Sequence, residues 1–292
     1  MRPHYRPRRS MLYVPSCVPR FLAKGRELQC DSLIFDLEDS VLPERKMEAR
    51  KNILDALTGD DYGCRELVVR VNGFDTPWGA ADLTAVARAG IDAVLLPKIQ
   101  SRADVENALR VLDAAGGGDL PVMVLIETPL AVLHAEEIAG ASERIAALVM
   151  GTSDLTNELH VRITADRIGL LASLSHCLLA ARAHDLPIVD GIHLDIKDSE
   201  NFERACRLGR DLGFDGKSLI HPFQIPYAND AFTPRPASVD MAQRVIAAMA
   251  EAKAAGNGVA VVDGRLIESL HLEAAKRTLM IHDMIQQCWG GT

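Results

Sequence analysis

Short apolar runs alternate along the chain with longer stretches in which apolar residues recur every three or four positions. The short runs predict β-strands, and they are MLYV at 11–14, SLIFDL at 32–37, ELVVRV at 66–71, DAVLLP at 92–97, VMVLIE at 122–127, ALVM at 147–150, PIVDGI at 187–192 and GKSLI at 216–220. The longer stretches predict amphipathic helices, at 45–57, 80–89, 103–115, 166–184 and 199–212. Strands that alternate with helices in this way are typical of a parallel sheet.

Eight strands with helices between them favour a closed (β/α)8 barrel, the TIM barrel of the α/β class. A doubly wound open sheet is the structural alternative. The Gly-rich phosphate turn that usually follows the first strand of such a sheet is missing here. We therefore expect residues 1–228 to form a barrel that is the catalytic domain.

The pattern changes after residue 221. A Pro-rich connection is followed by a helix near 238–255, a Gly-bounded segment and a final helix. A tail of about 70 residues buries too little surface to be an independent catalytic domain. We expect residues 229–292 to be a small helical extension that packs on the barrel or on a neighbouring subunit.

Composition and charge exclude some classes of function. The 292 residues suit one large barrel with a small addition, since such barrels take about 250 residues. A net charge of -8 argues against a general nucleic-acid binder. The basic cluster Arg2, Arg6, Arg8 and Arg9 resembles the start of a targeting segment, but Pro15 cuts short the apolar run that follows. No segment approaches a membrane span, so we expect a cytoplasmic protein.

Polar residues stand at the ends of seven of the predicted strands, where a (β/α)8 barrel carries its catalytic groups. They are Glu38 and Asp39, Arg70 and Asn72, Lys98, Glu127, the run 151–154, Asp190 and His193, and Lys217 and His221. A single charge at a strand end is usually a loop salt bridge or a helix cap. Charges that converge on one mouth would repel one another unless a metal or an anionic substrate organised them, so the set predicts an active site.

Glu127 and Asp154 follow adjacent strands and offer two hard oxygen donors without a His or Cys cluster. This favours Mg²⁺, with Mn²⁺ as an alternative, because Mg²⁺ keeps several waters and takes one or two carboxylates. The remaining positions of the metal could chelate a 2-oxo or 2-hydroxy acid. Arg70 could clamp a substrate carboxylate or stabilise a developing alkoxide or enolate.

Two further sets of cations each leave two interpretations open. Lys98 could form a Schiff base with a carbonyl substrate, but the nearby acidic residues favour a charged partner of Glu38 or Asp39. Arg20 and Lys24 lie one turn apart at the start of the first helix. They could meet a phosphate at the barrel mouth or form an ordinary solvated surface.

A series of ordered motifs resembles the citrate lyase β-subunit-like family. This is the CoA-ester lyase branch of the HpcH/HpaI aldolase superfamily, which includes malyl-CoA and citramalyl-CoA lyases. The motifs are RSMLYVPS, SLIFDLEDSV, LVVRVNGFDTPW, AVLLPKI, LIETPLAV, MGTSDL, LGFDGKSLIHPFQI and VVDGRLIE. The resemblance extends from about Arg9 to the last helix.

The resemblance implies a (β/α)8 barrel in which Glu127 of the IET motif and Asp154 of the GxxDL motif hold Mg²⁺. It implies that Arg70 contacts the substrate oxygens. The acidic pair Glu38 and Asp39 then supports the site.

The resemblance also implies that Arg20 and Lys24 contact the phosphates of CoA. The C-terminal segment of such enzymes reaches the active site of a neighbouring subunit and contributes an acid after a GRLI-like motif. Glu268 stands in that place, where many relatives have Asp. The chain also departs from the pattern at Ser16, where Gly is common, and at Ser153, where Glu is common.

These features together predict reversible cleavage of a 3-hydroxyacyl-CoA, of the malyl-CoA or citramalyl-CoA type, into acetyl-CoA and glyoxylate or pyruvate. Arg70 and the backbone N–H groups of Gly151, Thr152 and Ser153 would stabilise charge on the oxo-acid half. Glu268 is the expected proton carrier on the acetyl side. The alternatives are a lyase subunit for a citryl carrier protein, a malyl-CoA thioesterase and a barrel that binds acyl-CoA without turnover. We expect a homo-oligomer, a trimer or hexamer, with small-molecule partners only.

Overall fold

A closed parallel barrel forms the larger part of the computed structural model, which describes residues 6–59 and 61–290. Its strands pair in chain order, and the last pairs with the first, so the predicted TIM barrel is confirmed. Each strand that the apolar runs predict is present, with small differences at the ends. The strands are β1 (Ser10–Pro15), β2 (Ser32–Asp36), β3 (Glu66–Arg70), β4 (Ala93–Leu96), β5 (Val122–Ile126), β6 (Ile145–Met150), β7 (Ile188–Asp190) and β8 (Gly216–Leu219).

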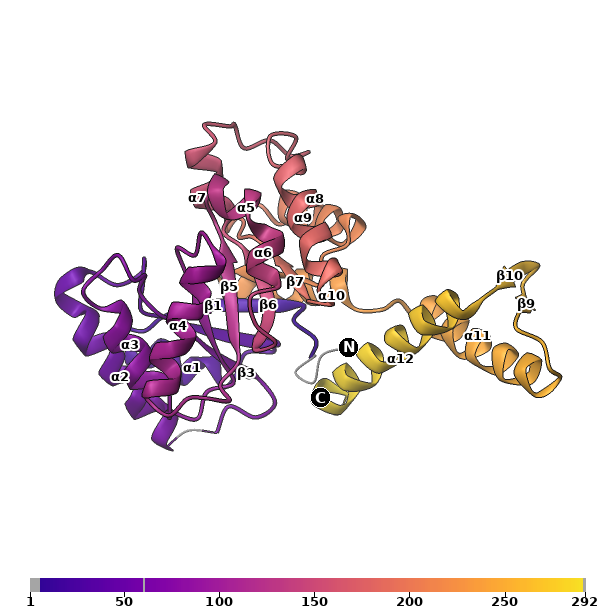
Figure 1. The fold of residues 1–292 in the computed structure, drawn as a ribbon, viewed down its shortest axis with the longest axis horizontal. Helices are drawn as coiled ribbons and strands as arrows, with labels where there is room; N and C mark the ends of the chain where they lie inside the picture. Colours follow the sequence, from indigo (N-terminus) through magenta and orange to yellow (C-terminus); the bar gives the residue numbers. More distant parts are fainter. Residues whose placement is uncertain (1–5, 60, 291–292) are drawn as a thin grey trace. The chain divides into compact units, whose positions relative to one another are not determined.

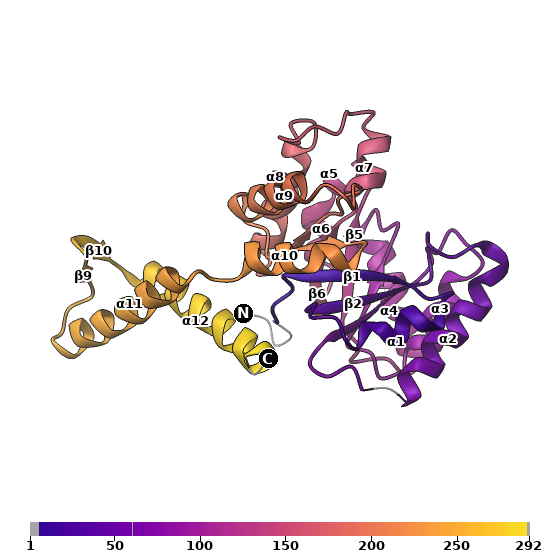
Figure 2. The same cartoon turned by 180° about the vertical axis from the view of Figure 1, so that it is seen from behind.

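Helices surround these strands in Figure 1. They are α1 (Pro19–Gly25), α2 (Lys46–Gly59), α3 (Gly79–Val86), α4 (Arg102–Ala114), α5 (Pro129–Leu133), α6 (Ala135–Ala139), α7 (Thr152–Glu158), α8 (Leu171–Ala183), α9 (Ser199–Leu212) and α10 (Ile225–Phe232), with 3₁₀ turns η1 (Pro43–Arg45) and η2 (Pro222–Gln224). The expected Pro-rich connection after residue 221 thus contains a helix. Pro222 and Pro226 stand at the first turns of η2 and α10, where the missing N–H groups cost no helical hydrogen bond. Figure 2 shows α10 beside β1.

Alternation along the strands separates two apolar cores. Side chains that point into the barrel form one core, made of Met11, Ile34, Val68, Ala93, Leu95, Met123, Leu125, Ala146, Ala147, Val149 and Val189. Their neighbours point outward and pack against the helices. Because side chains on one face recur every second residue, the inward face continues from Ile34 to Asp36, from Val68 to Arg70 and from Leu125 to Glu127. The strands therefore place these three charged side chains at the C-terminal mouth, directly above the apolar interior.

A buried ion pair closes the opposite end of the barrel. Glu66 opens β3, and its Oε1 and Oε2 atoms lie 2.6 and 2.8 Å from Nη2 and Nε of Arg8. Ser32 Oγ donates a further hydrogen bond of 2.7 Å to Glu66. Although burial disfavours the carboxylate, the guanidinium of Arg8 holds the pKa of Glu66 below its ordinary value. Arg9 pairs in the same region with Asp31, at 2.7 Å.

The basic cluster therefore contributes to the floor of the barrel through Arg8 and Arg9, whereas Arg2 lies outside the described residues.

None of the helices in the described parts of the chain combines the length and apolar character that a membrane crossing needs.

The chain divides into two compact units, Met1–Phe232 and Thr233–Thr292. In the second unit, α11 (Pro236–Ala254) and α12 (Ser269–Trp289) pack side by side, joined by the hairpin of β9 (Ala260–Val262) and β10 (Arg265–Ile267) (Figure 1). Asp263 and Gly264 at the hairpin turn have φ values of 49° and 73°, as a type I′ turn requires. The unit has its own small apolar core, which includes Val245, Met249 and Val262. Its expected packing on the barrel or on a neighbouring subunit stays a prediction.

The floor of the barrel provides a test of stability. Glu66→Gln should lower the free energy of unfolding at pH 7 by about 3 kcal/mol or more, because it leaves the buried Arg8 without this carboxylate. The folded-state pKa of Glu66 is depressed, so the advantage of the wild type is complete above the ordinary value of 4.5 and is lost as the pH falls through the folded value. Chemical denaturation at several pH values measures both effects.

The control is Glu48→Gln, which removes the exposed ion pair between Glu48 and Arg45 and should change stability little. A Glu66→Gln protein as stable as this control at pH 7 would contradict the structural role of the pair.

Candidate active site

A cavity of about 480 Å³ opens at the C-terminal mouth of the barrel. Its lining contains many of the residues that the sequence singles out, namely Asp39, Arg70, Glu127, Gly151, Thr152, Ser153 and Asp154. They come from the ends of β2, β3, β5 and β6, so the fold brings together residues that lie far apart in the chain. Glu38 is buried beside them, whereas Arg20 and Lys24 are not in the lining.

Arg70 is held at the mouth by Asp36, a residue that the sequence interpretation did not select. The two residues are partners in the β2–β3 register, and Nε and Nη2 of Arg70 donate to the two Asp36 oxygens at 2.7 and 2.8 Å. Burial alone would raise the pKa of Asp36, but the guanidinium of Arg70 holds it below its ordinary value. The guanidinium also lies over the ring of Tyr13, 4.7 Å from its centre. Its Nη1 atom is left to face Glu38 and Asp39, at 2.8 and 3.3 Å.

Glu38 is a buried carboxyl group with an unusual proton affinity. Its Oε2 atom lies 2.8 Å from Arg70 Nη1, but the alignment makes this an ion pair without a hydrogen bond to Oε2 among the described residues. Burial raises the pKa of Glu38 to about 8, since it outweighs the opposing effect of Arg70. Glu38 can therefore hold or release a proton near neutral pH. Asp39 beside it is largely exposed.

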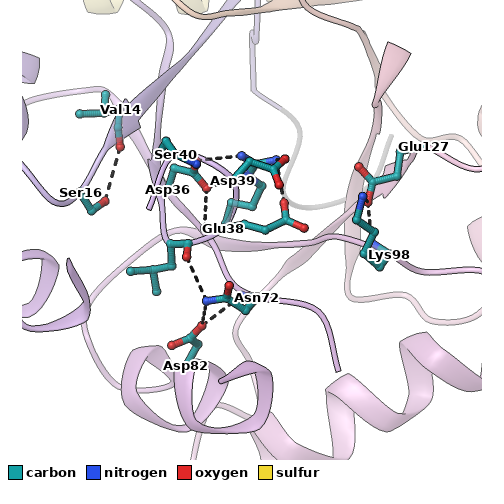
Figure 3. Close-up of polar contacts among 12 residues, drawn as sticks. Val14, Ser16, Asp36, Glu38, Asp39, Ser40, Asn72, Asp82, Lys98 and Glu127 are labelled. Atoms are coloured by element: carbon teal, nitrogen blue, oxygen red, sulfur yellow. Dashed lines mark hydrogen bonds and ion pairs between the residues drawn. The ribbon is translucent and has the colours of Figure 1, made fainter. Parts of the chain in front are cut away.

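A polar network behind the mouth fixes the backbone of this acidic segment. Lys46 Nζ donates to the carbonyl oxygens of Leu37 and Glu38, both at 2.8 Å, and to Asn72 Oδ1 at 2.6 Å. Asn72 in turn donates to Leu37 O and to Asp82, as Figure 3 shows for Asn72 and Asp82. Asn72 is thus a structural residue, although it stands at a strand end. Lys46 and Asp82 lie in helices, where their charges give no sign of this role in the sequence.

Glu127 lies at the centre of the candidate metal site. One of its oxygens, Oε1, accepts a hydrogen bond of 2.7 Å from the backbone N–H of Lys98. The other, Oε2, is buried and has no hydrogen-bond partner among the described residues. Burial raises the pKa of Glu127 to about 6, and Lys98 opposes this rise. A buried carboxylate oxygen without a partner is costly, so it points to a cation as its partner.

Gly151 makes room for this glutamate. A Cβ atom at Gly151 would lie 2.3 Å from Glu127 Cβ and 3.1 Å from Glu127 Oε2. Its backbone N–H donates to Ile126 O at 2.8 Å, so this N–H is already engaged within the sheet. Gly151 therefore serves the site through its missing side chain, while Thr152 and Ser153 remain the candidates for backbone donors to a substrate.

The ammonium group of Lys98 lies between the two candidate ligands, 3.5 Å from Glu127 Oε1 and 3.4 Å from Asp154 Oδ1. Figure 3 shows Lys98 facing Glu127. The expectation that Lys98 pairs with Glu38 or Asp39 was wrong, because the turn after β4 directs its side chain toward β5 and β6. Although burial disfavours the charged form, the two carboxylates raise the pKa of Lys98.

The donors present fit Mg²⁺. Glu127 and Asp154 provide carboxylate oxygens, and Asp154 is partly exposed to the cavity, so waters and substrate oxygens can complete the coordination. No group of three or more His, Cys, Asp or Glu side chains within residues 6–59 and 61–290 is arranged to hold a metal. Two carboxylates with open positions are typical of Mg²⁺ and unlike a structural zinc site.

Asp190 at the end of β7 and Lys217 in β8 form a separate structural cluster with Arg167. Asp190 is fully buried and accepts hydrogen bonds from Arg167, at 2.7 and 2.8 Å, and from Lys217, at 2.7 Å. This cluster attaches the segment before α8 to the barrel. It lies at a second cavity of about 370 Å³ that shares Thr152 and Ser153 with the first.

Three predicted residues are exposed, two of them on α1 of the barrel unit and one in the second unit. Arg20 and Lys24 are exposed on α1, and the guanidinium of Arg20 packs 5.2 Å from the ring centre of Phe21. Glu268 is exposed in the second unit, where it precedes α12 and its backbone N–H donates to His271 Nδ1 at 3.1 Å. Their roles stay predictions.

Known proteins resemble this chain over most of its length. A family model described as HpcH/HpaI aldolase/citrate lyase matches residues 9–222. The chain is 48% identical over 273 residues to the (3S)-malyl-CoA thioesterase of Cereibacter sphaeroides strain KD131, covering 94% of each protein. It is 35% identical over 280 residues to citrate lyase subunit beta of Escherichia coli K12, covering 94% of this chain and 93% of that protein. Among solved structures it resembles CitE of Mycobacterium tuberculosis in complex with magnesium, acetoacetate and coenzyme A, with a TM-score of 0.75, 31% identity, and coverage of 95% of this chain and 98% of that one.

The raised pKa of Glu38 predicts a dependence of stability on pH. Between an ordinary value of 4.5 and about 8, the folded protein binds a proton that the unfolded chain releases, so stability falls as pH rises through this window. Glu38→Gln stays neutral and avoids this loss. Its stability relative to wild type should increase by on the order of 2 kcal/mol between pH 5 and pH 9, measured by chemical denaturation.

The exposed Glu44→Gln is the matched control and should show no such trend. A Glu38→Gln difference that is the same at pH 5 and pH 9 would show that Glu38 ionises normally.

Proposed function

The chain belongs to the HpcH/HpaI aldolase/citrate lyase family, as its ordered motifs predicted, and on that premise we propose that it cleaves a carbon–carbon bond in a CoA thioester. The substrate is a 3-hydroxyacyl-CoA of the malyl-CoA or citramalyl-CoA type. The products are acetyl-CoA and a 2-oxo acid, glyoxylate or pyruvate, and the reaction is reversible.

The observation that carries this proposal is the unpartnered Glu127 oxygen beside Asp154, in one cavity with Arg70. Glu127 and Asp154 would hold Mg²⁺, and the related CitE structure contains magnesium together with acetoacetate, a small oxo acid. When bound there, Mg²⁺ supplies a Lewis acid that polarises substrate oxygens. Asp39 after β2 and Arg70 at the end of β3 line the same cavity, so a substrate bound there would meet both groups.

Arg70 stabilises the negative charge that develops on the oxo-acid half. Two of its nitrogens are fixed by Asp36, so the guanidinium does not have to reorganise during the reaction. Its Nη1 atom faces the acidic pair and is the nitrogen that Asp36 leaves free to meet a substrate oxygen. The ion pair with Asp36 thus fixes the orientation of the Arg70 guanidinium.

Cleavage needs a group that takes the proton of the 3-hydroxyl and a second one that protonates the acetyl carbon. Glu38 has a pKa of about 8 and an oxygen that no described residue hydrogen-bonds, so it suits the first task or its relay through Asp39. Glu268 is our candidate for the second task. It would act from the C-terminal extension of a neighbouring subunit in a homo-oligomer, with its longer side chain in place of the Asp common in the family.

CoA binding is assigned to Arg20 and Lys24. Both are exposed on α1, the helix that follows β1 at the mouth of the barrel. Two cations one turn apart can pair with the diphosphate of CoA, while the thioester extends toward Arg70. The CitE complex with coenzyme A supports a CoA site in this family.

Thioester hydrolysis is the second candidate function, because a relative at 48% identity is a (3S)-malyl-CoA thioesterase. Both reactions would use the same substrate and the same metal site, and they differ in whether a carbon–carbon or a carbon–sulfur bond breaks. A citryl-carrier lyase subunit is a third candidate, given the similarity to citrate lyase subunit beta.

Product analysis tests these alternatives. Incubation with Mg²⁺, acetyl-CoA and glyoxylate, pyruvate or oxaloacetate should give one dominant adduct that mass spectrometry identifies. The purified adduct, returned to the enzyme, should yield acetyl-CoA and the oxo acid. Free CoA and the hydroxy acid in place of acetyl-CoA would establish hydrolysis, and no reaction with any free CoA thioester would contradict the proposal.

Arg70→Lys tests the role of the guanidinium. The substitution keeps a positive charge but loses the two parallel hydrogen bonds to Asp36, so kcat/KM should fall by about 100-fold or more. Affinity for Mn²⁺, measured by calorimetry, should stay near the wild-type value. Arg45→Lys, which alters the guanidinium that pairs with Glu48 outside the cavity lining, is the control, and an Arg70→Lys enzyme with control-like kcat/KM would remove Arg70 from the mechanism.

A further inference from the structure

Lys98 occupies a position that no part of the proposed reaction uses. Its ammonium group lies 3.5 Å from Glu127 and 3.4 Å from Asp154, so a single cation bridges both candidate metal ligands. Without a cation, two carboxylates at this spacing would repel each other at the mouth of the barrel. Lys98 therefore provides the charge that a metal would provide at the same place.

The backbone at Lys98 is adapted to this position. Its φ is 55°, in the left-handed region that side chains other than Gly rarely adopt. In this conformation the backbone N–H donates to Glu127 Oε1 at 2.7 Å while the side chain turns to the same carboxylate. Such a conformation persists only where the surroundings fix it, and the two contacts with Glu127 do so.

The side chain nevertheless has the freedom to leave. About a third of it is exposed, and lysine has a flexible four-carbon stem. At Gly73, a Cβ atom would lie 3.3 Å from Lys98 Cγ, so a side chain there would crowd the stem. The ammonium can therefore move away from the carboxylates while the backbone N–H keeps its bond to Glu127.

We infer that Lys98 is a built-in counter-ion of the Glu127–Asp154 pair, which a divalent cation displaces when it binds. The inference rests on the proposed metal site, and it adds that Lys98 lowers the affinity of this site for the metal. Lys98 competes with the metal for the same oxygens, so it stabilises the carboxylate pair without metal and weakens metal binding. A lysine that only positioned the ligands would have the opposite effect, because its loss would weaken metal binding.

Metal titration of Lys98→Met distinguishes the two roles by the sign of the effect. Protein freed of metal with a chelator is titrated with Mn²⁺, and free Mn²⁺ is followed by its paramagnetic resonance signal. Lys98→Met should bind Mn²⁺ roughly 3- to 10-fold more tightly than wild type, since a repelling charge at the site is removed. Without metal, the melting temperature of Lys98→Met should lie below that of wild type, by on the order of 2 °C. Saturating Mn²⁺ should raise the melting temperature of Lys98→Met by more than it raises that of wild type.

Two controls separate the effect of charge from that of altered structure. Lys98→Arg keeps the charge and should bind Mn²⁺ with an affinity close to that of wild type. Lys51→Met removes an exposed lysine that pairs with Asp55 on α2, and it should change neither measurement.

Equal or weaker Mn²⁺ binding by Lys98→Met would overturn the inference. Glu127→Gln and Asp154→Asn provide a separate check of its premise. If both bind Mn²⁺ as wild type does, the metal site itself is wrong and the proposed function loses its main support. If they lose Mn²⁺ while Lys98→Met fails to tighten it, the metal site stands and only the role of Lys98 is rejected.

Discussion

The bidentate ion pair between Asp36 and Arg70 is the interaction on which the active-site end of the barrel depends. It joins β2 to β3 at their last paired residues and places a fixed positive charge at the mouth. The side chains of Asp36, Glu38 and Asp39 lie around the guanidinium of Arg70, and they differ in how closely and how well aligned they contact it. Asp36 accepts two aligned hydrogen bonds and stays ionised, whereas the buried Glu38 has only a poorly aligned contact and retains its proton up to about pH 8. Asp36 thus stays charged because Arg70 pairs with it fully, whereas burial outweighs the weaker contact of Arg70 with Glu38 and leaves that carboxyl able to exchange a proton.

The two ends of the barrel use the same chemistry for different purposes. At the floor, Arg8, Glu66 and Ser32 satisfy one another with short hydrogen bonds, and the carboxylate of Glu66 has no unpaired oxygen among the described residues. At the mouth, Glu38 and Glu127 each keep a buried oxygen to which no described residue donates a hydrogen bond. Unsatisfied polar atoms reduce stability, so they are expected where a ligand completes them. The distribution of satisfied and unsatisfied carboxylates therefore separates the structural end from the functional one.

Much of this arrangement could be predicted from the sequence, because it follows from periodicity. Alternation with a period of two and strand order place Arg70, Glu127 and Asp154 around one mouth. The same alternation could have found Asp36, which continues the inward face of β2 from Ile34, but it lies one residue inside the predicted strand rather than at its end. Lys46 and the geometry of Lys98 could not be found in this way. The role of Lys46 depends on how α2 packs behind the mouth. The role of Lys98 depends on a left-handed backbone conformation, which a lysine in the sequence does not predict.

The pairing of β1 with β8 also affects the order in which the barrel can be assembled during synthesis. Asp36 and Arg70 lie on neighbouring strands, so they can meet soon after both have left the ribosome. The partner of β1 on its other side is β8, which is made last among the barrel strands. Until then, both outer strands keep an unpaired edge, which is the kind of surface that recruits other chains. The nascent protein therefore carries an exposed, aggregation-prone edge through most of its translation, and it is released from that risk only when β8 emerges and closes the ring.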